Sequence, residues 1–147
     1  MEDIKNEDVQ AAVDAAKPKL PEFDKDELLR VFDQIIFEGE YSEDVTIKGK
    51  LKVVFRARSV EDTTSITREI DGKNFSLITT LQEQRALLNL AYSLVSYAGK
   101  DLGKMELEER KKFINKLPAA VVAALSAELS KFDLKVDMAC REGEANF

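Results

Sequence analysis

This 147-residue chain contains no histidine, so the residue types that remain for catalysis are mainly carboxylates, lysine and tyrosine. Histidine is the commonest general base and the commonest ligand for transition metals, so its absence argues against both chemistries. The single cysteine, Cys140, has no histidine to activate it and no second cysteine with which to form an intramolecular disulfide. We therefore expect a protein that binds rather than an enzyme, and we expect no cofactor.

Two acidic clusters have the residue types of a metal site or of paired catalytic carboxylates. Neither follows the D-x-D-x-D-G frame of a calcium loop. The cluster formed by Asp24, Asp26 and Glu27 stands where a helix is expected to begin, so helix capping explains it. We therefore expect no metal site at either cluster. A catalytic role would require a concave site that holds carboxylates with strongly raised pKa values. The clusters are Glu38, Glu40, Glu43 and Asp44, and Asp24, Asp26 and Glu27.

Residues 44–58 alternate between apolar and mostly basic side chains, which is the period of a β-strand. A single strand of that length would be unusual, so the segment is predicted to be an antiparallel β-hairpin. A three-residue loop over Lys48–Lys50 pairs Ile47 with Leu51 and keeps the apolar face intact, whereas a two-residue loop would place a lysine on it. Two strands are too weak alone, so this face is predicted to lie on helices.

The basic side chains of this hairpin form a cationic face, which is the sharpest candidate site in the sequence. The simplest interpretation is a solvated surface whose lysines discourage edge-to-edge pairing. The functional alternatives are an acidic protein segment and nucleic acid. The net charge of −6 and the lack of aromatic residues among these cations disfavour nucleic acid. The face consists of Lys48, Lys50, Lys52, Arg56 and Arg58.

The remaining periodic segments are predicted to be helices, so the expected fold is α+β and mainly α. Residues 77–98 carry two apolar faces and need partners on most sides, which predicts a helical bundle around this one central helix. Asp24 with Glu27 has the N-cap and N3 spacing of a capping box, and Ser59 and Asp62 are expected at the N-cap and N3 positions of the next helix. The predicted helices are Phe23–Phe37, Ser59–Ile70, Leu77–Ala98, Glu106–Lys116 and Pro118 to about Ala139.

Chain length and a hydrophobic content of 44% predict one domain, which we place at residues 23–139. An acidic N-terminal arm (residues 1–22) and a C-terminal tail (residues 140–147) flank it. Within the arm, residues 6–16 can form a short helix that is marginal alone. The arm lacks the apolar core of a signal peptide, and the apolar run in residues 77–98 is too short to cross a bilayer. We therefore expect an intracellular protein that does not enter a membrane.

A V-x-I-x-G-K…F-R element precedes a short acidic helix and a mostly helical body. Its residues are Val45, Ile47, Gly49, Lys50, Phe55 and Arg56, followed by Val60-Glu61-Asp62 and by Leu117-Pro118. This order resembles small phage tail proteins of the baseplate-hub and tail-assembly type, over residues 44–139. The resemblance implies a non-enzymatic assembly chaperone or virion subunit, located in the host cytoplasm, the virion or both. Its partners would be other tail or baseplate proteins, including copies of itself.

The mechanism expected for such a protein is bridging between subunits. Apolar residues of the arm and the chain terminus would dock on neighbouring subunits while the cationic hairpin engages an acidic surface. These docking residues are Ile4, Val9, Val13, Leu20, Phe23 and Phe147. The alternative is a nucleic-acid-associated or regulatory binding domain that uses the same hairpin and binds less tightly as salt rises. If Leu87, Leu90 and Leu94 prove exposed, they would form a further contact surface.

Overall fold

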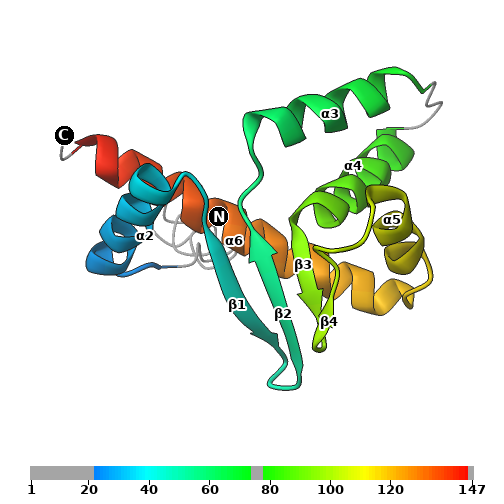
Figure 1. Ribbon diagram of the computed structural model, residues 1–147, viewed down its shortest axis with the longest axis horizontal. Coiled ribbons are helices and arrows are strands. Elements are labelled where there is room, and N and C mark those ends of the chain that lie inside the picture. Colours follow the sequence, from blue (N-terminus) through cyan, green and yellow to red (C-terminus); the bar gives the residue numbers. More distant parts are fainter. Residues whose placement is uncertain (1–21, 74–77, 146–147) are drawn as a thin grey trace, which may run out of the picture.

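The computed structural model describes residues 22–73 and 78–145 and shows an α+β protein that is mainly helical (Figure 1). The predicted α+β class with mainly helical content is therefore confirmed. The elements are α2 (Lys25–Glu38), β1 (Ser42–Ile47), β2 (Leu51–Arg56), α3 (Val60–Asp71), α4 (Ile78–Ser93), β3 (Leu94–Tyr97), β4 (Lys100–Asp101), α5 (Leu107–Asn115) and α6 (Ala119–Ala145).

The predicted hairpin forms with the predicted register. Strands β1 and β2 are antiparallel, and Ile47 pairs with Leu51 across the loop of residues 48–50. Lys48 and Gly49 take positive φ angles of 52° and 69°, which turns the chain sharply. The register is correct because only an odd-numbered loop keeps the apolar side chains of both strands on one face.

The sheet is larger than the predicted hairpin, because the predicted helix over residues 77–98 is wrong at its C-terminal end. Helix α4 ends at Ser93, and the next four residues form β3, which pairs with β2. Strand β4 completes an antiparallel sheet in the order β1-β2-β3-β4. Ala98 and Gly99, with φ angles of 49° and 84°, form the tight turn between β3 and β4. This turn and the pairing with β2 outweigh the helical spacing of the apolar residues.

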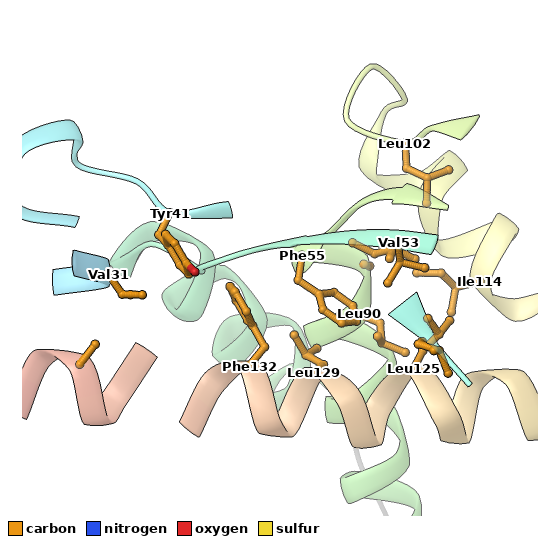
Figure 2. Close-up of a cluster of buried hydrophobic side chains, with 14 of the residues drawn as sticks. Val31, Tyr41, Val53, Phe55, Leu90, Leu102, Ile114, Leu125, Leu129 and Phe132 are labelled. Carbon is orange, nitrogen blue, oxygen red and sulfur yellow. The ribbon is translucent and has the colours of Figure 1, made fainter. Parts of the chain in front are cut away.

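Helix α6 lies along one face of the sheet and packs against α2 and α4 (Figure 1). Its apolar side chains meet those of β2 and α4 in the main core, where Phe55, Leu90 and Leu125 have no exposed surface (Figure 2). A bundle centred on residues 77–98 is not confirmed. The predicted end of the last helix near Ala139 is wrong, since α6 continues to Ala145 into the predicted tail.

Helices α3 and α4 share a second, smaller core. Ile66 and Ile70 of α3 are buried against Leu88 of α4. The predicted N-cap of α3, Ser59, is confirmed, and it forms a capping box with Asp62: the Ser59 hydroxyl accepts from the Asp62 amide, and the Asp62 carboxylate accepts from the Ser59 amide.

Helix α2 begins after the predicted N-cap, Asp24, but that side chain makes no capping hydrogen bond. The predicted capping box is therefore wrong at this helix. The Glu27 carboxylate instead accepts a hydrogen bond from Lys135 of α6. An ion pair between two helices thus replaces the expected local contact. At the other end of α2, Gly39 is the predicted stop and has a φ angle of 73°.

Candidate functional site

The β1–β2 hairpin places the three predicted lysines at and beside its turn. Lys48, Lys50 and Lys52 are all exposed. The hairpin extends away from α6, so its tip is open to solvent in the described part of the chain (Figure 1). None of the three lysines forms an ion pair with another described residue. They are therefore available to an anionic partner at no cost in internal contacts.

The two predicted arginines have different surroundings from the lysines. Arg56 forms an ion pair with Asp62 at the start of α3, with 3.2 Å between the charged groups, and is 35% exposed. Arg58 is only 16% exposed and donates hydrogen bonds of 2.6 Å to Ser93 Oγ and 2.7 Å to Asp133 Oδ2. Lys48, Lys50 and Lys52 are therefore unpaired among the described residues, while Arg56 and Arg58 hold the fold together.

The contacts of Arg58 secure the point where helix changes to strand. Ser93, the last residue of α4, is fully buried, and its hydroxyl accepts from Arg58. Two residues earlier, the Ala91 carbonyl accepts a 3.1 Å hydrogen bond from Arg110 of α5. The last four carbonyls of a helix lack partners within it, so Arg110 satisfies one that would otherwise be unpaired. Sequence periodicity gave no signal for either contact.

The sheet face opposite α6 is open among the described residues. Asp44, Thr46, Lys52, Val54 and Ser96, which come from β1, β2 and β3, line a shallow hollow there. Val54 and Ser96 are half-buried, whereas Thr46 and Lys52 are exposed. The hollow thus places a small apolar surface at Val54 beside Lys52 of the hairpin.

Lys135 is a buried charged residue that the sequence analysis did not single out. Its ammonium group lies 2.5 Å from a Glu27 oxygen and 2.8 Å from a Glu43 oxygen. Burial is the largest single influence and lowers the pKa of Lys135, but its hydrogen bonds with the two glutamates and the nearby negative charge together raise that pKa by more, so the net shift is upward. A signal was present, because Lys135 continues the apolar stripe that contains Leu129 and Phe132.

A second lysine-centred cluster lies between α3, α4 and α5. Lys111 is 2.6 Å from Glu69 and 3.2 Å from Glu108, and these groups line a hollow with Gln84 of α4. Burial lowers the pKa of Lys111, and the hydrogen bonds and charges of the two glutamates together raise that pKa by more. The cluster joins α3 to α5 through compensated charges.

Most of the predicted docking residues lie outside the described part of the chain. These are Ile4, Val9, Val13, Leu20 and Phe147. Phe23 is described; it is half-buried and packs against the main core, so it already has an intramolecular contact. Leu90 and Leu94 are fully buried and Leu87 is half-buried. A contact surface at these three leucines was expected only if they were exposed, so the structure does not support one.

No family model matches the chain, and no curated protein or solved structure matches it. Within residues 22–73 and 78–145, no group of three or more Cys, Asp or Glu side chains is arranged to hold a metal ion. In that same part of the chain, no helix is both long and apolar enough to cross a bilayer.

Burial raises the pKa of the Cys140 thiol, and the charges of Glu144 and Asp137 add to this shift.

Proposed function

We propose that this chain is a non-enzymatic assembly or structural protein of a phage tail or baseplate, and that it acts through protein–protein contacts. The observation that carries the proposal is the exposed lysine group of the β1–β2 hairpin. Lys48, Lys50 and Lys52 make no ion pairs within the described residues, whereas other described lysines, such as Lys111 and Lys135, do. The order of the hairpin, the acidic helix and the helical body supports the phage assignment.

In the proposed mechanism the hairpin presents positive charge to an acidic protein surface. Charge complementarity of this kind speeds the encounter and fixes the orientation of partners more than it adds affinity. Apolar contacts from the N-terminal arm would supply the remaining binding energy. The partners are other tail or baseplate proteins, including further copies of this chain, and the chain acts as a chaperone or a virion subunit.

The test is quantitative mass spectrometry of density-purified particles beside the lysate from which they came. A fixed copy number in particles would identify a structural subunit. Recovery only in lysate, bound to unassembled tail proteins, would identify a chaperone. Either result supports the proposal, and recovery in neither fraction would overturn it.

The same lysines could instead contact nucleic acid, and salt dependence separates the two functions. Each phosphate contact releases counterions, so binding to DNA or RNA by three lysines would fall about 10-fold to 100-fold as salt rises from low to physiological concentration. We expect no such binding by the purified chain in fluorescence anisotropy. Tight binding lost in a Lys48→Glu, Lys50→Glu, Lys52→Glu variant would replace the assembly function with the nucleic-acid function.

A further inference from the structure

The uncovered face of the sheet and the hairpin tip together form a surface without a described occupant. We call it the hairpin surface and define it by Lys48, Lys50, Lys52, Thr46, Val54 and Ser96. Three of these residues bring exposed positive charge, which outweighs the one exposed carboxylate that lines the hollow, Asp44, and the half-buried Val54 adds apolar surface. A complementary ligand would be an acidic segment with a narrow apolar stripe.

The N-terminal segment of this same chain has that composition. Residues 2–16 carry five acidic side chains and one basic one, Lys5. Their apolar residues fall at spacings of three and four, so a helix would place them on one stripe. The acidic residues are Glu2, Asp3, Glu7, Asp8 and Asp14, and the stripe is Val9, Ala12, Val13 and Ala16.

The dimensions of the segment and of the surface also agree. Residues 6–16 as a helix would be roughly 16 Å long. Strand β1, with six residues, is roughly 20 Å long. Residues 17–21, which contain two prolines, add a linker of up to about 17 Å before the described chain begins. The segment is thus long enough to cover the hairpin surface of a neighbouring molecule.

We infer that residues 2–16 of one copy dock on the hairpin surface of a second copy, and that the exchange is reciprocal. Each copy supplies one acidic segment and one hairpin surface, so two equivalent contacts close a two-fold dimer. Once the first contact forms, the second is intramolecular, which converts two weak contacts into a stable pair. This inference rests on the proposed function and names the acidic surface that the hairpin engages.

Sedimentation velocity of the purified full chain tests the inference through exchanged charges. The hairpin-swapped variant carries Lys48→Glu, Lys50→Glu and Lys52→Glu, and the arm-swapped variant carries Glu7→Lys, Asp8→Lys and Asp14→Lys. At low salt we expect the wild type at twice the monomer mass and each variant alone as a monomer. An equimolar mixture of the two variants should form a heterodimer, since both of its contacts are again complementary.

A chain that contains both swaps should dimerise by itself. The matched control carries Lys104→Glu, Lys112→Glu and Lys116→Glu, which changes three exposed lysines outside the hairpin by the same charge, and it should remain dimeric. Circular dichroism of each variant establishes that it is folded.

A monomeric wild type at all concentrations would overturn the inference, as would a folded hairpin-swapped variant that still dimerises. A mixture without heterodimer would show that the segment binds its own chain or another partner, and would also overturn it. These failures are distinct from failure of the proposed function. A monomeric chain recovered in particles would refute the reciprocal dimer and leave the assembly role standing.

Discussion

At the scale of single residues, Lys135 joins three elements that are distant in sequence. It projects from α6 and binds Glu27 of α2 and Glu43 of β1, and its side chain is only 8% exposed. The hydrogen bond from Lys135 is the largest cause of the lowered pKa of Glu27. This ion cluster fixes α2 and β1 on the same helix and so sets the position from which the hairpin extends.

Lys135→Met should destabilise the protein by about 1–3 kcal/mol, because it leaves two partly buried carboxylates without their cation. Equilibrium unfolding in urea measures the change in the free energy of unfolding. Lys131→Met is the matched control, since Lys131 lies one turn earlier on α6 and is 59% exposed. The control should change the free energy of unfolding by less than about 0.5 kcal/mol. Equal effects in the two variants would contradict the role of Lys135.

The same cluster predicts how stability depends on pH. In the folded protein the pKa of Glu27 lies below its ordinary value of 4.5. Its contribution to the free energy of unfolding is therefore present above pH 4.5 and is lost as the pH falls through the folded pKa. In the folded protein the pKa of Lys135 lies above its ordinary value of 10.5. Its contribution to the free energy of unfolding is therefore present below pH 10.5 and is lost as the pH rises through the folded pKa. The difference in the free energy of unfolding between the wild type and Lys135→Met should therefore become smaller as the pH falls below 4.5. A difference that stays constant as Glu27 protonates would contradict this prediction.

The roles of Lys135 and Arg58 could not be read from the sequence because their partners are remote. Arg58 is 75 positions from Asp133, and Lys135 is 108 positions from Glu27. Alternation correctly placed the lysines of the hairpin in solvent, but it grouped Arg58 with them. Periodicity predicts which face a residue is on within its own element, whereas an ion pair depends on which elements later pack together.

At the scale of elements, the hairpin was predictable and β3 was not. The hairpin loop was fixed by alternation within fifteen residues, because any other parity would expose the apolar face. The residues of β3 instead continue the helical spacing of α4, and Leu90 and Leu94 are both buried. Only the pairing with β2 and the tight turn that follows distinguish the strand from a longer helix.

The turn between β3 and β4 can be tested at Ala98. Its φ angle of 49° is unfavourable for alanine and acceptable for asparagine, and Asn-Gly is the preferred pair in such turns. Ala98→Asn should therefore stabilise the protein by up to about 1 kcal/mol in thermal unfolding. The control is Ala127→Asn, at an exposed position inside α6, which should destabilise it. Loss of stability in Ala98→Asn would contradict the assigned turn.

The contact between α2 and α6 can be tested at Gly143, inside the predicted tail. A Cβ atom at this position would lie 2.2 Å from ring carbons of Phe32, so the ring would have to move. Gly143→Ala should destabilise the protein by up to about 2 kcal/mol, since overpacking costs about 1–3 kcal/mol and alanine gains ~1 kcal/mol as a helix former. Chemical denaturation measures the difference.

The double variant Phe32→Leu, Gly143→Ala should recover part of the loss relative to Phe32→Leu alone, because the smaller side chain leaves room for the methyl group. Glu144→Ala, at the exposed neighbouring position, is the control and should be nearly neutral. A stabilising effect of Gly143→Ala would show that the two helices are farther apart than described.

At the scale of the whole molecule, charge is divided between two uses. The arginines of the hairpin segment and the buried Lys135 hold elements together, whereas the exposed lysines of the hairpin make no ion pair with another described residue. Helix α6 covers one face of the sheet, and no other element within residues 22–73 and 78–145 covers the opposite face or the hairpin tip (Figure 1). This arrangement separates the folding role of basic residues from the proposed binding role, so the two should respond to mutation independently.

The most direct test of that separation replaces the wild-type chain during particle assembly with the hairpin-swapped variant, Lys48→Glu, Lys50→Glu, Lys52→Glu. The measurement is the yield of complete particles, compared with the melting temperature of each purified chain. We predict that the hairpin-swapped variant melts within a few degrees of the wild type, since exposed substitutions change stability by about ±0.5 kcal/mol, and that it yields no complete particles. The control with Lys104→Glu, Lys112→Glu and Lys116→Glu should assemble normally. Normal particle yield with the hairpin-swapped variant would contradict the proposed role of the hairpin.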